Sequence, residues 1–189
     1  MKKLFVLTCT ILFAIAVQAQ EHMAFKGVSM NCTLSSFVSQ LTTKGYTKLY
    51  MNDRGAVLSG DFAGKQDCKI IVLSTSSSKV VWKVAVQFPE KVSWRSLKTE
   101  YETLKESYTE KYGNPETFEF FSTPYYEGDG YELQALSLEK CTYTSFFSSP
   151  QGNICLKITN DKCVQVGYED AINVKIRENE KNKVVSDDI

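Results

Sequence analysis

The chain contains one histidine among its 189 residues. That residue, His22, stands near the N-terminus, where we expect a mobile lead-in. A Ser-His-Asp or Cys-His nucleophile needs an imidazole in a fixed position, and many zinc sites use histidine as a ligand. The sequence therefore argues against enzymes of these classes, and it predicts neither a catalytic residue nor a metal site.

Nucleotide-binding motifs and a basic surface stripe are also missing. Neither GxxxxGK[ST] nor GxGxxG occurs, so nucleotide and dinucleotide cofactors are not indicated. The 22 basic residues are balanced by 22 acidic ones, without a clustered basic stretch. Because nucleic-acid binding depends on such a cluster, nucleic acid is a poor partner for this chain. The sequence predicts no cofactor.

Residues 1–19 have the pattern of a secretory signal peptide. Lys2-Lys3 precedes an apolar run over residues 4–17, and Val17-Gln18-Ala19 fits the small-residue cleavage pattern. The run is shorter than the roughly 20 residues that a membrane span needs, and no later stretch is apolar enough to span. We expect export to the periplasm or the extracellular space, without a transmembrane segment after cleavage.

The first half of the mature chain predicts one helix followed by four strands. Four apolar residues share one helix face: Leu34, Phe37, Val38 and Leu41. Gly45 can end this helix in the left-handed conformation. The period then falls to two in the runs YTKLYM, GAVLSGDF, CKIIVLS and VVWKVAVQF. In the last run the alternation places Trp82 on the same buried face as Val84.

The second half repeats this order with a longer helix. Ser93 is a good N-cap, and Gly113 and Pro115 end the helix. One apolar and aromatic stripe runs along it: Trp94, Leu97, Tyr101, Leu104, Tyr108 and Tyr112. Five strand-like runs follow: TFEFF, YELQALSL, CTYTSFF, ICLKIT and CVQVGY. Residues 177–189 are rich in charged and amide side chains, and we expect them to form a flexible tail.

These elements predict an α+β fold of two helix-plus-antiparallel-meander units. The turns between strands are too short for crossover helices, so the strands must be antiparallel. The units, about residues 25–88 and 92–170, form one sheet with both helices packed on one face, in a single domain over residues 20–176. The helix positions of one unit align weakly with those of the other, which suggests an internal repeat.

This tandem order resembles the β-lactamase inhibitor protein-like fold and the outer-membrane assembly lipoproteins that share its small repeat. The stretches that carry the resemblance are TLSSFVSQLTTKG and SWRSLKTEYETLKESYTEKYG, each leading into strands. FKGVSMNCTLSSFVSQLTTKGY and KYGNP also look like stretches of small secreted bacterial proteins. The fold resemblance implies that a partner binds on the sheet face, and it brings no catalytic residues.

The stretch TPYYEGDGYE is the best candidate for a binding site. Asp129-Gly130 between alternating segments predicts a two-residue hairpin turn, which would set Glu127 opposite Glu132. Such like charges are unfavourable unless they are solvated or share a cation. An exposed hairpin without function, a protein or glycan contact, and a calcium site all stay open. The predicted binding residues are Tyr125, Tyr126, Glu127, Asp129, Tyr131 and Glu132.

We therefore expect an exported, non-enzymatic binding or interaction module of the cell envelope. Its partner would be a protein or a glycan, held by the helix-free sheet face or by the hairpin around Tyr126. Two alternatives remain. A carboxylate-dependent glycan hydrolase needs only two acidic residues at the right separation, and a structural envelope component would assemble with itself or with its neighbours. The sequence leaves the oligomeric state open.

Five of the six cysteines follow the predicted cleavage site: Cys32, Cys68, Cys141, Cys155 and Cys163. An oxidising compartment permits disulfides, and an odd number leaves at least one thiol without an internal partner. The residues alone leave most pairings open.

One pairing can be excluded. If residues 160–162 form a hairpin loop, Cys155 and Cys163 lie on one face but on the order of 13 Å apart along the ladder. That separation is too large for a disulfide. We predict that these two cysteines are not bonded to each other. Peptide mapping of the unreduced protein by mass spectrometry is the check, and a linked pair of peptides containing both would refute this register.

Overall fold

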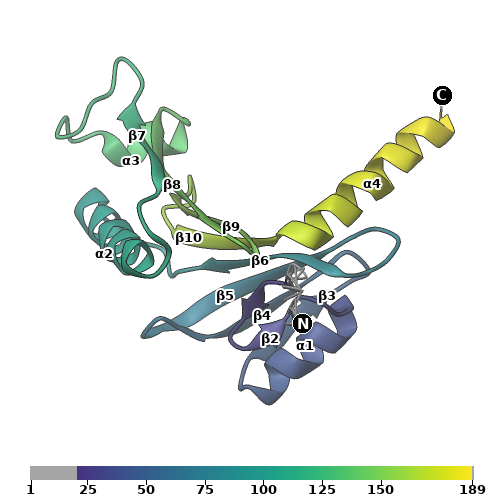
Figure 1. Cartoon of the computed structure of the whole chain (residues 1–189). Helices are drawn as coiled ribbons and strands as arrows, with labels where there is room; N and C mark the ends of the chain where they lie inside the picture. The colour runs from purple at the N-terminus through teal and green to yellow at the C-terminus, as the bar shows by residue number, and fades with distance from the viewer. Residues whose placement is uncertain (1–20, 189) are drawn as a thin grey trace, which may run out of the picture.

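A computed structural model describes residues 21–188 and shows an α+β fold, as predicted (Figure 1). Eight antiparallel strands form one sheet in the order β3-β4-β5-β6-β10-β9-β8-β7. Each half of this sheet is a meander of neighbouring strands, and the two halves meet where β6 pairs with β10. The predicted signal peptide, residues 1–19, lies outside the described residues. No helix in the described part of the chain is long and apolar enough to cross a membrane.

The first unit opens with a small two-stranded sheet of β1 (Ala24–Phe25) and β2 (Val28–Ser29). Helix α1 (Leu34–Thr43) follows, and Thr33 caps it by accepting a hydrogen bond from the Ser36 backbone N–H. Such a cap contributes about 1 kcal/mol. The four strands of this unit are β3 (Thr47–Met51), β4 (Gly55–Phe62), β5 (Lys65–Ser74) and β6 (Val81–Gln87).

The second unit opens with α2 (Trp94–Tyr112), which Ser93 caps as predicted. Its four strands are β7 (Glu116–Phe121), β8 (Cys141–Ser149), β9 (Gly152–Ile158) and β10 (Val164–Asp170). A short helix, α3 (Glu132–Ser137), stands between β7 and β8, and α4 (Ala171–Asp188) follows β10 directly. The two units therefore share one order of elements, a helix followed by four antiparallel strands.

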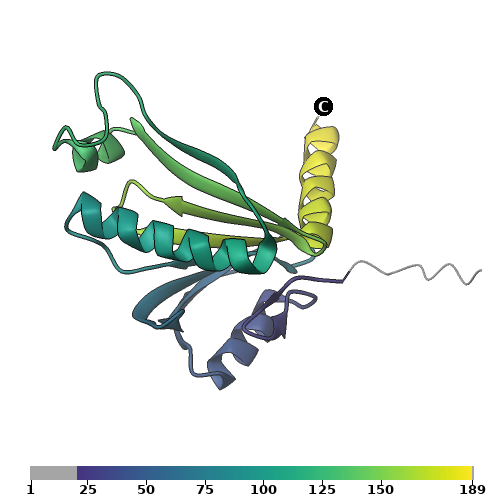
Figure 2. The ribbon, with the colours of Figure 1, turned by 60° about the vertical axis from the view of Figure 1, so that its left-hand side comes forward.

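Helices α1 and α2 cover the same face of the sheet, as predicted (Figure 2). Tyr168 on β10 lies where the two units meet on this face, with its ring 5.7 Å from that of Phe25 and 6.4 Å from that of Tyr108. One continuous hydrophobic core therefore joins both units. Burying each large apolar side chain in it stabilises the fold by roughly 1.5–3 kcal/mol.

The predicted register of the last hairpin is confirmed. Ile158 pairs with Val164, and Cys155 pairs with Gly167. Cys155 and Cys163 are accordingly not bonded to each other, and all five described cysteines are free. The prediction for Trp82 is wrong, because the β5–β6 ladder shifts between Leu73 and Ser74 and takes Trp82 out of the alternation. Trp82 is half-buried instead under the guanidinium of Arg177, 4.3 Å from the ring centre.

The run YELQALSL is wrongly predicted as a strand, because residues 132–137 form α3. Its alternation of apolar residues matches a strand, but Ala135 and Leu136 are the buried pair, and they are neighbours along the chain. Leu, Ala, Glu and Gln are also good helix formers. The second unit consequently has four strands where the sequence predicts five.

The predicted flexible tail is also wrong, because α4 continues to Asp188. Three side chains on one side of the helix hold it to the body. Asn173 donates to the backbone carbonyls of Met30 and Val81, and Arg177 covers Trp82. Glu180 accepts hydrogen bonds from the serine turn at residues 76–78. The helix nevertheless stands away from the sheet over its outer half (Figure 1).

The expectation of a mobile lead-in is wrong as well. The Nδ1 atom of His22 lies 3.2 Å from the carboxylate of Asp170, which is fully buried. The same carboxylate accepts from the backbone N–H groups of Met23, Ile172 and Asn173. Asp170 therefore caps α4 and ties the N-terminal segment to it.

The Glu180 contact makes the docking of α4 dependent on pH. Burial alone would raise the pKa of this carboxyl, but the hydrogen bonds from Ser78, Ser77 and Ser76 lower the pKa to about 2. Because the folded pKa lies below the ordinary value of 4.5, the contact is fully favourable above pH 4.5 and is lost as the pH falls toward 2. We predict that the backbone amide NMR signals of Ser77 and Ser78 titrate with a midpoint well below 4.5.

The matched control is Glu180→Gln, in which this titration should disappear. A midpoint near 4.5 in the unaltered protein would contradict the contact.

Candidate binding surfaces

The loop before α3 holds the six binding residues that the sequence predicts, but two of its carboxylates support the loop itself. Asp129 accepts hydrogen bonds from the backbone N–H groups of Tyr126, at 3.1 Å, and Tyr131, at 2.7 Å. Glu132 accepts from the Gly128 N–H at 2.9 Å. These carboxylates are therefore used within the loop, and the predicted two-residue hairpin is wrong.

Glu127 does not face Glu132 across a ladder. It forms an ion pair with Lys98 of α2 and accepts a hydrogen bond from the Tyr143 hydroxyl at 3.2 Å. The hydrogen bond from Lys98 is the main cause that lowers the pKa of Glu127. Glu127 therefore fastens the loop to α2. Among the described residues no group of three or more potential ligand side chains could hold a metal ion.

The three predicted tyrosines differ in exposure. Tyr126 and Tyr131 are 65% and 60% exposed, whereas Tyr125 is half-buried and accepts a hydrogen bond from the Gln134 amide at 3.1 Å. Only Tyr126 and Tyr131 can therefore offer large contact areas to a partner.

A second exposed apolar group lies on the helix-free face, and the sequence reasoning missed it. Phe118 and Phe120 of β7 and Phe146 of β8 are 42%, 51% and 42% exposed, and the rings of Phe118 and Phe146 meet edge to face at 6.1 Å. We call these three residues the aromatic edge. The sequence signal was the alternation of Phe118 and Phe120 around Glu119, but alternation does not tell which strand lies at the border of a sheet.

The aromatic edge belongs to an open border of the sheet. Among residues 21–188, strand β7 pairs only with β8, and the pairing is regular over all six residues. The opposite border strand, β3, contains a register shift between Lys48 and Tyr50. Bulges and charged side chains are devices that protect border strands from pairing with other chains. Strand β7 has no such bulge. It carries two charged side chains, Glu116 and Glu119, and Glu119 is paired with Lys105 of α2. The regular part of β7 around Phe118 and Phe120 can therefore accept another strand.

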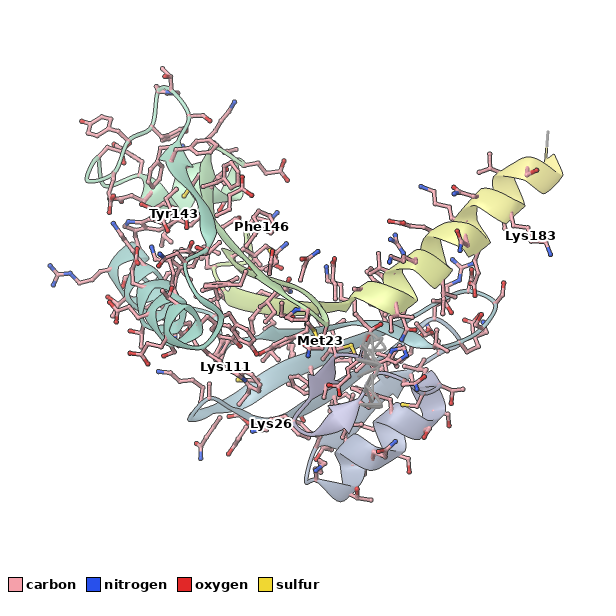
Figure 3. All side chains as sticks on the ribbon, viewed as in Figure 1. Met23, Lys26, Lys111, Tyr143, Phe146 and Lys183 are labelled. Atoms are coloured by element: carbon pink, nitrogen blue, oxygen red, sulfur yellow. The ribbon has the colours of Figure 1, made fainter. Side chains whose placement is uncertain are left out.

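Small side chains occupy the middle of the helix-free face. Ladder partners place Ile71, Ala85, Gly167 and Cys155 in one row, which continues to Phe146 of the aromatic edge. Figure 3 labels Phe146 among the side chains of this part of the sheet. Ala85 and Gly167 of this row are buried, and the Lys83 side chain reaches over Gly167.

The thiols near these surfaces are poor nucleophiles. Burial raises the pKa of Cys155 above its ordinary value, and burial raises the pKa of Cys141 to about 12. Because the thiolate is the reactive form, both groups are protonated at neutral pH.

Comparison with protein-family models, with curated proteins and with solved structures finds no match to this chain. The resemblance to the β-lactamase inhibitor protein-like fold stays a prediction from the order of elements.

The role of Asp129 within its own loop can be tested by Asp129→Ala. This change removes two acceptors, so the amide hydrogens of Tyr126 and Tyr131 should exchange with solvent at least about tenfold faster. Unfolding should change little, because the loop is exposed and lies outside the core. Hydrogen exchange followed by NMR is the measurement, with Asp161→Ala in another exposed turn as the control. Unchanged exchange at both amides would show that the side chain does not hold the loop.

Proposed function

We propose that the chain is an exported, non-enzymatic binding module that docks an extended segment of a protein partner along β7. The single observation that carries this proposal is the open, regular border strand with three exposed phenylalanines beside it. Binding by strand addition uses main-chain hydrogen bonds for affinity and side-chain contacts for specificity.

The chemistry of β7 favours a partner with an apolar strand. Phe118 and Phe120 point to the helix-free face, and the unpaired backbone groups of β7 lie beside them. Exposed apolar residues gathered in one place are typical of protein contacts. Tyr126 and Tyr131, in the loop that follows β7, are also exposed, and tyrosine is enriched among the residues that contribute most to protein contacts. Export and a place in the cell envelope rest on the N-terminal sequence pattern.

The experiment places a photo-reactive benzoylphenylalanine at position 118 in the producing cells. We expect a discrete covalent adduct with a second protein after irradiation. Adding Phe120→Lys to the same chain should remove the adduct, because a charge on the apolar strand face opposes docking.

The control carries the same reactive group at Tyr50 on β3, the opposite border. Equal adducts from both positions would indicate collision without docking and would contradict the proposal. An adduct containing only this chain would replace the proposed partner with a second copy, in line with a structural component.

A further inference from the structure

The helix side of the molecule contains a groove between the two units, on the face of the sheet opposite to the aromatic edge. Two hollows of about 590 and 480 Å³ adjoin there, since both are lined by Ala63, Ser107 and Tyr108. Helix α2 forms one wall, and the turn between β4 and β5 with the β1–β2 hairpin forms the other. Lys26 and Lys111, labelled in Figure 3, stand on opposite walls. We call these two hollows the seam groove.

A buried carboxylate with spare hydrogen-bonding capacity lines the seam groove. The side chain of Glu100 is 5% exposed, and its Oε1 lies 3.0 Å from the ammonium of Lys91 and 3.5 Å from that of Lys65. Its Oε2 makes no hydrogen bond with any described residue. A buried acceptor without a donor is costly, by about 1–3 kcal/mol or more for a charged group. Glu100 is therefore placed to accept from a ligand.

Positive charge exceeds negative charge along the seam groove. Five cationic side chains line it: Lys26, Lys65, Lys91, Arg95 and Lys111. Glu100 is the one acidic residue that lines either hollow. Lys26, Arg95 and Lys111 form no ion pair with any described residue. Lys26 and Lys111 contact aromatic rings, which do not neutralise their charges, so an anionic ligand can still pair with them.

Helix α2 adds a stripe of hydroxyl groups to the wall. Ser96, Thr103 and Ser107 line the first hollow, and each donates its hydroxyl hydrogen to a backbone carbonyl of the preceding turn. Because their hydrogens are used, the hydroxyl oxygens are left as acceptors. The stripe therefore suits a ligand with many hydroxyl donors.

Aromatic rings form the floor of the second hollow. The rings of Phe25 and Phe62 are stacked at 5.5 Å, and those of Tyr108 and Tyr112 at 5.8 Å. Lys26 lies over the Phe62 ring at 5.5 Å and Lys111 lies over the Tyr112 ring at 4.9 Å, so these rings hold the two ammonium groups at the hollow.

We propose that the seam groove binds an anionic oligosaccharide, a sugar chain that carries carboxylate groups. Its hydroxyls donate to Glu100 and to the serine and threonine oxygens, and its carboxylates meet the lysines and Arg95. An acidic peptide also matches the charges of the groove. Its backbone, however, offers about one hydrogen-bond donor per residue, which is fewer donors than a sugar offers to the acceptors of the groove. This proposal does not depend on the function proposed for β7, because the two surfaces lie on opposite faces of the sheet.

The first experiment measures binding of hexagalacturonate to the purified protein by calorimetry in about 50 mM salt. We expect saturable binding, weakened at about 500 mM salt because screening reduces the attraction. A neutral hexasaccharide of glucose should bind at least about tenfold more weakly. Lys26→Ala combined with Lys111→Ala should weaken hexagalacturonate binding by roughly threefold or more. The control pair Lys69→Ala with Lys157→Ala, on the helix-free face, carries the same charge change and should leave binding unchanged.

The second experiment uses Glu100→Gln and separates a built site from simple charge attraction. If charge attraction alone held the ligand, Glu100→Gln would bind hexagalacturonate more tightly, because the variant has one negative charge fewer. In the proposed site the amide oxygen turns to the two lysines and the amide nitrogen faces the ligand, so an acceptor is lost. We expect binding to weaken about tenfold. Thermal unfolding of the variant checks that it is folded. Arg95→Ala, at an exposed residue of the same groove, is an independent test, because loss of this positive charge should also weaken binding of hexagalacturonate.

Three results would overturn the proposal. Tighter binding by Glu100→Gln would show an unspecific basic surface. Hexaglutamate binding as well as or better than hexagalacturonate would assign the groove to an acidic protein segment. No binding of hexagalacturonate at millimolar concentration by the folded protein would leave the groove without its proposed ligand.

Discussion

The antiparallel pairing of β6 with β10 is the constraint on which the rest of the structure depends. It joins two meanders of four strands into one sheet, and it places the helices of both units on the same face. Val84 pairs with Tyr168 and Val86 with Val166 at this junction, so the core passes from one unit to the other without interruption. Neither meander could bury its helix-covered face as completely alone, because each would expose a border strand there.

The same pairing brings the N-terminal segment next to the start of α4. Strand β10 ends at Asp170 beside β6, and the buried carboxylate of Asp170 takes hydrogen bonds from the N-terminal segment and from the first turn of α4. Asn173 then bonds to Val81 of β6 and to Met30. The N-terminal segment and the first turn of α4 are therefore fixed at one point of the sheet. Because these hydrogen bonds hold its first turn, α4 leaves the body as an ordered helix and does not fray at its start.

How far the sequence predicts this structure depends on how local each signal is. Helices α1 and α2 and most strands follow from their periods and caps, which lie within a few residues of each other. Helix α4 does not, because the partners of Asn173 and Glu180 stand on the order of a hundred residues away. The candidate surfaces were harder still. Glu127 and Glu132 looked like opposed charges, but Lys98 on another element neutralises one of them. Which strand is a border strand is likewise decided by tertiary pairing.

Helix α2 connects the two proposed surfaces physically. On one side it presents Glu100 to the seam groove. On the other, the buried Tyr101 donates to Glu119 of β7 at 3.0 Å and contacts the Ser145 hydroxyl of β8 at 2.6 Å. Lys105 reaches the same Glu119 at 2.7 Å. The border strand is thus held by the residues next to those that line the groove.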